Sequence, residues 1–123
     1  SDMDCPFCAG ERTLLAENLH AFAIEDGFPV SLGHSLVIPK IHVPALFDLS
    51  NEAYAACFDL ARVVRGLLIE KYKPDGFNIG TNCGESAGQT IAHAHLHVIP
   101  RYAGDVPNPR GGIRHVIPGK GYY

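Results

Sequence analysis

The sequence predicts an α+β fold in which an antiparallel β-sheet packs against one long helix. Segments of strand-like composition lie on both sides of a single stretch with helical periodicity, and turn residues connect them. Parallel strands need long crossover connections, which are usually helical, so these short connections favour antiparallel pairing.

Two strands are predicted before the helix, at 19–25 and 34–39. Both are rich in apolar residues, as runs of this kind are in half-buried or buried strands. Gly27, Pro29 and Gly33 lie between them, and these residue types favour turns. The sequence therefore predicts two strands separated by a turn-rich connection.

The helix is predicted over 51–72. Ser50 can cap its N-terminus because a serine hydroxyl accepts a hydrogen bond from a free backbone N–H, and Pro74 ends the helical pattern. Apolar residues recur along one side and predict a buried stripe of Cys57, Ala61, Val64 and Leu68.

Two more strands are predicted after the helix, at 76–82 and 91–99, with a glycine-rich loop between them. The segment 106–123 is rich in glycine and proline and is predicted to be an irregular tail. A chain of 123 residues is expected to form one domain over 1–123, and Ser1-Asp2 is interpreted as a cloning remnant.

Charge and hydropathy exclude several classes of partner. A formal charge of −3 gives no basic field for nucleic acid, and no apolar run approaches the roughly 20 residues that span a membrane. The first residues do not resemble a secretory signal. Four cysteines in a chain of this size do not suggest a disulfide framework, so a reducing cytoplasm is the expected location.

Three histidines, His93, His95 and His97, alternate with apolar residues in the last predicted strand. Successive side chains of a strand point to opposite faces, so the imidazoles are expected on one face, about 6.5–7 Å apart, with the apolar residues toward the core. Such a row of imidazoles suits either metal binding or phosphoryl chemistry.

The loop at 82–90, Asn-Cys-Gly-Glu-Ser-Ala-Gly-Gln-Thr, helps to separate these alternatives. Its glycines let backbone N–H groups approach an anion, and its amide and hydroxyl side chains are further donors. A candidate phosphate loop joined directly to imidazole nucleophiles favours phosphoryl chemistry for the row.

At these residues the sequence resembles the histidine-triad (HIT) family of nucleotide hydrolases and transferases. The resemblance is carried by the alternating pattern at 93–99, by the Gly-Gln-Thr at 88–90, and by 33–40, which is similar to a second family signature. It spans roughly 5–105. Residues 87–90 and 99–105 look closest to the Fhit-like branch and to bacterial diadenosine polyphosphate hydrolase-type HIT proteins.

The resemblance implies that His95 is the nucleophile that attacks a nucleotide phosphate. Imidazole can be neutral near pH 7 and attacks phosphorus without first losing a proton to a base, and a backbone carbonyl at its other nitrogen would fix which nitrogen attacks. His97 would bind the phosphate, and His34 would join the cluster from across the sheet. The matching positions for substrate contacts are Asn82, Gly88, Gln89 and Thr90 for phosphate or leaving group, Asp26 for ribose, and Phe7 and Phe28 for the base.

Cys5-Pro-Phe-Cys8 has the spacing of a two-cysteine metal knuckle. His42 and His93 are candidates to complete a tetrahedral Cys₂His₂ set, a choice that the resemblance to zinc-containing HIT proteins and galactose-1-phosphate uridylyltransferases supports. Four protein ligands leave no open position, so Zn²⁺ would be structural. Without zinc, Cys5 and Cys8 would be free thiols.

The leading hypothesis is a hydrolase that cleaves dinucleoside polyphosphates at the α-phosphate through a nucleotidyl-histidine on His95. A Hint-like nucleoside phosphoramidase and a nucleotidyltransferase are enzymatic alternatives. Asn82 bears on the first, because it stands where Fhit-type enzymes have glutamine and Hint-type enzymes have asparagine. A zinc-stabilised nucleotide-binding module without turnover is the non-enzymatic alternative. The long helix, the sheet edge and the resemblance together suggest a homodimer.

Overall fold

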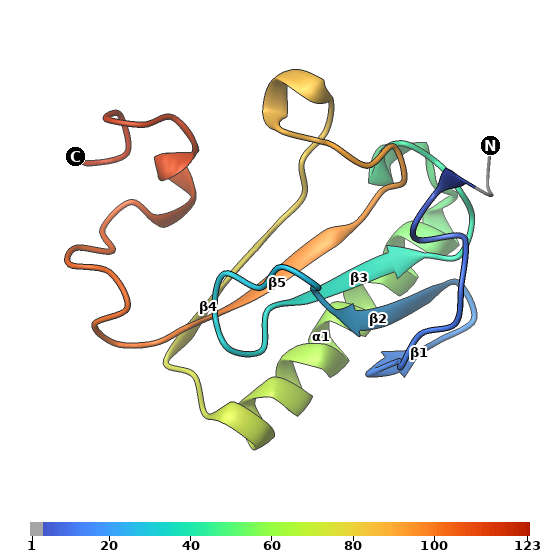
Figure 1. Cartoon of the computed structure of the whole chain (residues 1–123), viewed down its shortest axis with the longest axis horizontal. Helices are drawn as coiled ribbons and strands as arrows, with labels where there is room; N and C mark the ends of the chain where they lie inside the picture. Colours follow the sequence, from blue (N-terminus) through green and yellow to red (C-terminus); the bar gives the residue numbers. More distant parts are fainter. Residues whose placement is uncertain (1–3) are drawn as a thin grey trace.

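Helix α1 crosses one face of a five-stranded sheet in the computed structural model of the chain, which describes residues 4–123 (Figure 1). The interpretation of Ser1-Asp2 lies outside the described residues. The strands are β1 (Ala16–Glu17), β2 (Ala21–Glu25), β3 (Ser35–Pro39), β4 (Gly76–Gly80) and β5 (Leu96–Arg101), and α1 spans Asn51–Tyr72.

The sheet has the strand order β1-β2-β3-β5-β4, and every neighbouring pair is antiparallel. His97 of β5 is paired with Leu36 of β3 on one side and with Gly80 of β4 on the other. Strand β3 is buried along its whole length, because it is a central strand with apolar layers on both faces. The predicted α+β class and antiparallel pairing are confirmed.

Helix α1 has the predicted bounds and the predicted cap. The Ser50 hydroxyl accepts a hydrogen bond from the Ala53 N–H at 3.2 Å, and Lys73 ends the helix in the left-handed conformation with φ 53°. The predicted stripe is buried against strand residues that include Ala23, Val37 and Val98. Burial raises the pKa of the Cys57 thiol on this stripe to about 11, which makes it a core residue rather than a nucleophile.

The prediction that 91–95 belongs to a strand is wrong, because β5 begins only at Leu96. The backbone before it leaves the sheet: the Ala94 N–H donates to the Val43 carbonyl at 2.7 Å, and the Thr81 hydroxyl donates to the His95 carbonyl at 2.7 Å. These contacts replace the pairing that a strand would make. His93 and His95 therefore lie on an irregular segment that leads into β5.

The other strands are shorter than predicted, and one was not predicted. Strand β2 begins at Ala21 rather than at 19, because the Asn18 side chain accepts hydrogen bonds from the His20 and Ala21 N–H groups and closes a turn. The two-residue strand β1 precedes this turn. Strand β3 begins one residue later than predicted and β4 ends at Gly80.

The segment 106–123 lies beside β4 and is irregular apart from a 3₁₀ helix at Gly112–Val116 (Figure 1). Its contacts are largely internal. The Arg114 Nε donates to the Gly121 carbonyl at 3.0 Å, and the ring of His115 lies 2.7 Å from the Arg110 carbonyl. Within residues 4–123, no helix combines the length and apolar character needed to cross a bilayer.

Gly33 lies where the β2–β3 connection contacts the end of α1. Its φ of +89° is in the left-handed region, and a Cβ there would lie 2.8 Å from Cδ2 of Tyr72. Both backbone conformation and space therefore require glycine at this position.

Gly33→Ala is expected to lower the free energy of unfolding by about 2 kcal/mol, through strained φ and overlap with Tyr72. Urea denaturation measures this change. Gly27→Ala is the matched control, because a Cβ at Gly27 meets no heavy atom within 4 Å and its φ is not left-handed. Equal stability of the two variants would contradict the account.

Candidate functional site

Four side chains, Asp26, His34, His95 and His97, form a cluster on the face of the sheet opposite α1. His97 alternates in β5 with Leu96 and Val98, which pack on the helix side, so its ring points to the other face. The rings of His95 and His97 are 5.1 Å apart, and those of His34 and His97 are 5.2 Å apart. We call this group the histidine cluster.

The tautomer of His95 is fixed by its own backbone neighbour. Its Nδ1 lies 2.9 Å from the His93 carbonyl oxygen. Because a carbonyl only accepts, Nδ1 carries the proton and Nε2 keeps a lone pair. The Thr81 hydroxyl holds the His95 carbonyl, so backbone and ring are both fixed. The structure thus contains the predicted imidazole with one nitrogen held and the other available to react.

A chain of hydrogen bonds determines which ring nitrogen of His34 and of His97 carries the proton. The Val30 N–H donates to His34 Nδ1 at 3.1 Å, so the neutral His34 carries its proton on Nε2. His34 Nε2 then donates to His97 Nδ1 at 2.9 Å. His97 is left with its proton on Nε2, where it can donate to an oxygen of a bound anion.

Burial keeps these two imidazoles uncharged at neutral pH. Burial lowers the pKa of His34, and the Asp26 carboxylate, 3.4 Å from His34 Nε2, partly opposes this shift. Burial also lowers the pKa of His97, with the neighbouring His95 and His34 acting in the same direction. Both rings therefore serve as hydrogen-bonding groups rather than as fixed positive charges.

Asp26, His34 and His97 are close enough to hold a metal ion by distance alone. The proton arrangement argues against it, because the Val30 N–H occupies Nδ1 of His34 and leaves the proton on Nε2, the atom that would have to coordinate. The group is better described as a hydrogen-bond network that orients His97.

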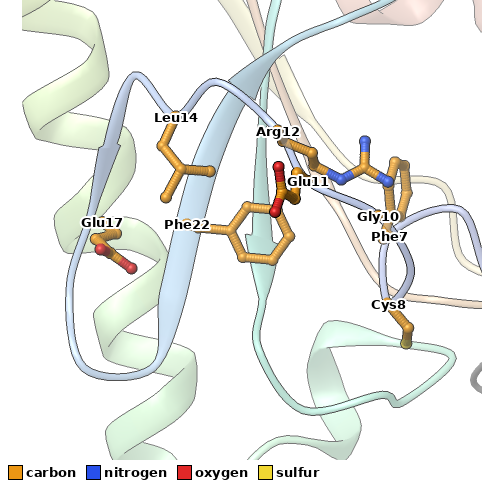
Figure 2. Close-up of a pocket in the computed structure, with 8 residues that line it drawn as sticks. All are labelled: Phe7, Cys8, Gly10, Glu11, Arg12, Leu14, Glu17 and Phe22. Carbon is orange, nitrogen blue, oxygen red and sulfur yellow. The ribbon is translucent and has the colours of Figure 1, made fainter.

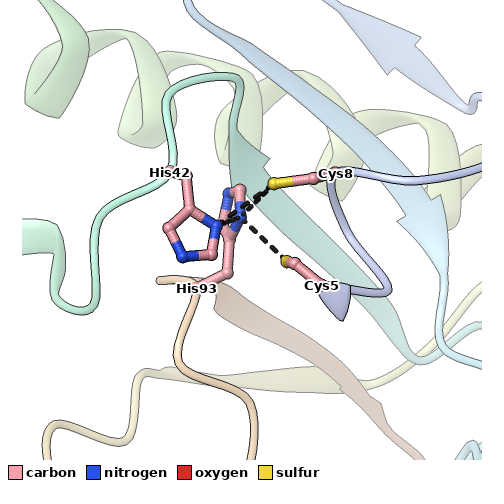
Figure 3. A group of neighbouring side chains, drawn as sticks. All are labelled: Cys5, Cys8, His42 and His93. Atoms are coloured by element: carbon pink, nitrogen blue, oxygen red, sulfur yellow. Dashed lines mark hydrogen bonds between the residues drawn. The ribbon is translucent and has the colours of Figure 1, made fainter. Parts of the chain in front are cut away.

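A second group, Cys5, Cys8, His42 and His93, lies beside the cluster, and its ligand atoms are all within 4.8 Å of one another (Figure 3). His93 Nδ1 is 3.3 Å from Cys5 Sγ, 3.4 Å from Cys8 Sγ and 3.1 Å from His42 Nδ1. Cys8 Sγ is 3.1 Å from His42 Nδ1. The structure brings together all four predicted ligands, which we call the Cys₂His₂ group.

The donor atoms of the Cys₂His₂ group fit a zinc ion. Zinc with bonds of about 2.1 Å to nitrogen and 2.3 Å to sulfur would space tetrahedral ligands by about 3.3–3.8 Å, close to the separations found. His93 Nε2 lies 2.8 Å from the Pro39 carbonyl, so its proton is on Nε2 and Nδ1 has one lone pair. That lone pair cannot accept from two thiols and a second imidazole together, whereas a cation satisfies all four ligands.

The loop between β4 and β5 holds the predicted phosphate contacts, Asn82, Gly88, Gln89 and Thr90. The Gln89 amide is committed to backbone: its Oε1 accepts from the Gly84 N–H at 2.9 Å, and its Nε2 donates to the Pro44 and Ile91 carbonyls at 2.7 and 3.0 Å. Gln89 therefore closes and anchors the loop. Gly88 and Thr90 line a hollow of about 570 Å³ beside it, and Asn82 is half-buried after β4.

The two aromatic residues predicted as base walls differ sharply in the structure. Phe7 is 9% exposed, and its ring centroid lies 5.1 Å from that of His95. It also lines a hollow of about 470 Å³ together with Arg12, Leu14 and Phe22 (Figure 2). Phe28 is 90% exposed on the β2–β3 connection. The structure brings Phe7 to the histidine cluster and leaves Phe28 facing solvent.

Two groups in the site were not predicted from the sequence. Thr81 acts through its hydroxyl, and its place beside Asn82 at the end of a strand was an available signal. Val30 acts through its backbone N–H, so its side chain carries no signal of its role.

Comparisons with known proteins agree with this architecture. The model of the HIT domain family matches residues 10–104. An uncharacterized 16.1 kDa HIT-like protein of Mycoplasma pneumoniae is 42% identical over 88 residues, which are 72% of this chain and 61% of that protein. The adenylylsulfatase HINT3 of Arabidopsis thaliana is 38% identical, over 80% of this chain and 52% of its own length. The bis(5′-adenosyl)-triphosphatase of Dictyostelium discoideum is 36% identical, over 72% of this chain and 59% of that protein.

Solved structures lead to the same family. A HIT family protein from Bacillus anthracis has a TM-score of 0.77 and 36% identity, covering 83% of this chain and 76% of that one. A zinc-bound histidine triad family protein from Mycobacterium smegmatis has a TM-score of 0.79 and 35% identity, covering 88% and 82%. The chain spans about half to three fifths of the three curated relatives named above. The family match, the shared fold and the histidine cluster together show that this chain belongs to the HIT domain family.

Proposed function

We propose that this chain is a nucleotide hydrolase that cleaves dinucleoside polyphosphates at the α-phosphate through a nucleotidyl-histidine on His95. The supporting observation is the contact of 2.9 Å between His95 Nδ1 and the His93 carbonyl, which leaves the lone pair of Nε2 free for attack. A neutral imidazole with one nitrogen held is suited to nucleophilic attack without a separate base.

The reaction has two steps with balanced bonds. In the first, Nε2 of His95 forms a bond to the α-phosphorus, and the bond from that phosphorus to the bridging oxygen breaks, releasing the remaining nucleotide. In the second, water attacks the same phosphorus, the P–N bond breaks, a proton is lost to solvent, and a nucleoside monophosphate leaves. His97 Nε2–H donates to a phosphoryl oxygen and so stabilises the charge that develops there.

The names of two relatives support a nucleotide substrate for this chain. One is an adenylylsulfatase and the other a bis(5′-adenosyl)-triphosphatase. Each name describes a cleavage reaction on an adenosine-containing substrate, and the leaving group differs between the two reactions. A nucleotidyl transfer to His95 is compatible with either leaving group, and the resemblance to the Fhit-like branch leads us to the polyphosphate.

We propose the following contacts between the protein and the substrate. The base lies in the hollow beside Phe7, and the Asp26 carboxylate accepts from the ribose hydroxyls. Asn82 and Thr90 donate to phosphate oxygens, with the backbone of Gly88 between them. Gln89 supports these contacts by holding the loop rather than by touching phosphate.

The Cys₂His₂ group would hold Zn²⁺ with four protein ligands and no open position, so the ion supplies structural stabilisation and no reaction step. A bound ion would hold the N-terminal segment against the segment that carries His95. The side chains that attack the phosphorus and stabilise the developing charge are those of the histidine cluster.

His95→Asn is expected to lower kcat by roughly 10³-fold or more while the Kd for AMP changes only a few-fold, because the nucleophile is lost and the contacts to substrate remain. Product analysis of diadenosine polyphosphate hydrolysis measures the rate, and calorimetry measures the Kd. Intact mass spectrometry of quenched wild-type reactions should detect a nucleotidyl adduct that the variant lacks. His20→Asn, outside the cluster, is the control, and undiminished turnover by His95→Asn would refute the mechanism.

Stability is expected to fall as the pH drops below about 6.5. The folded pKa values of His34 and His97 lie below their ordinary value of 6.5, so the unfolded chain binds protons first. The free energy that these two neutral imidazoles contribute to folding is complete above about pH 6.5. It is lost as the pH falls toward their pKa values in the folded protein. Thermal unfolding from about pH 7.5 to about pH 5.5 measures the loss. A His34→Asn/His97→Asn double variant should show a shallower dependence, and an unchanged one would contradict this explanation.

The purified protein is expected to contain about one zinc ion per chain, measured by elemental analysis. A Cys5→Ser/Cys8→Ser double variant should lose the ion and unfold at a lower temperature. Cys83→Ser is the matched control, because Cys83 is an exposed thiol outside the Cys₂His₂ group. Zinc well below stoichiometry in the wild-type protein would refute the assignment.

A further inference from the structure

One aromatic side chain, Phe7, joins the Cys₂His₂ group to the histidine cluster. It lies in sequence between the two cysteine ligands, and its ring contacts one histidine of each group. The ring centroids of Phe7 and His93 are 5.8 Å apart with an interplanar angle of 90°, and those of Phe7 and His95 are 5.1 Å apart at 66°. Both are edge contacts of the kind that aromatic rings favour.

The turn that carries Phe7 is attached to the fold through its side chains. The Cys8 and Ala9 N–H groups both donate to the Cys5 carbonyl at 3.1 Å, which closes a local turn. The hydrogen bond that joins this segment to β2 comes later, from the Leu15 N–H to the Ala23 carbonyl at 2.8 Å. The turn itself is positioned by the packing of Phe7 and by its two thiols.

The histidine half of the Cys₂His₂ group is held by the fold itself. His93 is fully buried, its Nε2 donates to the Pro39 carbonyl at 2.8 Å, and the next residue, Ala94, donates to Val43 at 2.7 Å. The two halves of the group therefore differ. The imidazole of His93 is preorganised without a metal, whereas the cysteine turn gains its strongest attachment from the metal.

Phe7 also forms a wall of a hollow of about 470 Å³. Arg12 places its guanidinium carbon 5.6 Å from the centre of the Phe7 ring, and Phe22 lines the same hollow from β2 (Figure 2). Pockets of this volume with aromatic walls suit a flat apolar group such as a nucleobase. One ring thus both lines this hollow and contacts His95.

We infer that metal binding at the Cys₂His₂ group positions Phe7 and thereby controls the affinity of the site for a nucleotide. With the metal bound, the cysteine turn is fixed and the ring is held against His95 as a preformed wall. Without it, the turn loses this attachment and moves, so binding a nucleotide must also order the turn. The inference rests on the proposed function in one respect, that the hollow receives the nucleoside.

Loss of the metal is expected to change the affinity for nucleotide more than the rate of the chemical step. The His95 Nδ1 contact is to the backbone of His93, which is held independently of the cysteines. Removal of zinc is therefore expected to raise the Kd for AMP about tenfold and to change kcat less. Phe7 contacts the nucleotide in this proposal, and the metal takes no part in the reaction.

A single-tryptophan reporter tests the inference directly, because the chain contains no tryptophan. In Phe7→Trp, removing zinc with a chelator is expected to shift the emission to longer wavelength as the ring becomes solvated, and added zinc should reverse the shift. Phe28→Trp is the matched control, since Phe28 is 90% exposed and its emission should not respond. Calorimetry on the wild-type protein, with and without zinc, gives the Kd for AMP.

The results separate this inference from the proposed function. A Kd for AMP or an emission of Phe7→Trp that is unchanged on zinc removal overturns the inference alone. Zinc-dependent AMP binding without hydrolysis of dinucleoside polyphosphates overturns the proposed function and leaves the inference standing, whereas absence of AMP binding overturns both. If Phe7→Trp does not fold, ¹⁹F-labelled phenylalanine in the wild-type chain reports on the same ring, with the same outcomes.

Discussion

The hydrogen bond between His95 Nδ1 and the His93 carbonyl is the constraint on which the rest of the site depends. It exists because the backbone leaves the sheet just before β5, so that a carbonyl turns toward the following ring instead of toward a neighbouring strand. His93 then has three separate roles. Its carbonyl fixes His95, its Nε2 donates to Pro39, and its Nδ1 faces the two cysteines and His42. One residue therefore connects the central strand β3, the Cys₂His₂ group and the histidine cluster.

Buried, neutral imidazoles at His34 and His97 are suited to a substrate that brings its own negative charge. Neutral donors positioned at the phosphoryl oxygens stabilise the charge that develops there during reaction. The backbone N–H of Val30 determines the proton positions of His34 and, through it, of His97. The positions of these protons therefore depend on the path of the backbone as well as on the residue types.

Features that depend on local pattern were predictable from the sequence. Helix α1, its Ser50 cap and its buried stripe follow from periodicity and capping chemistry, and the four ligands of the Cys₂His₂ group follow from spacing together with family resemblance. The departure of 91–95 from the sheet was not predictable, because Val43 and Thr81, which cause it, are distant in sequence. Gln89 matched a phosphate-binding motif, yet the structure commits its amide to carbonyls that no local pattern identifies.

Burial of β3 on both faces has a consequence for how this chain can vary. In a strand with one solvent-exposed face, every second position tolerates a polar residue. In β3, by contrast, each residue of Ser35–Pro39 is buried. Sequence drift in a lineage of such proteins should therefore slow along this strand and concentrate in the outer strands and connections. The strand that places Leu36 opposite His97 is thus protected from change by packing alone, before any selection for function acts on it.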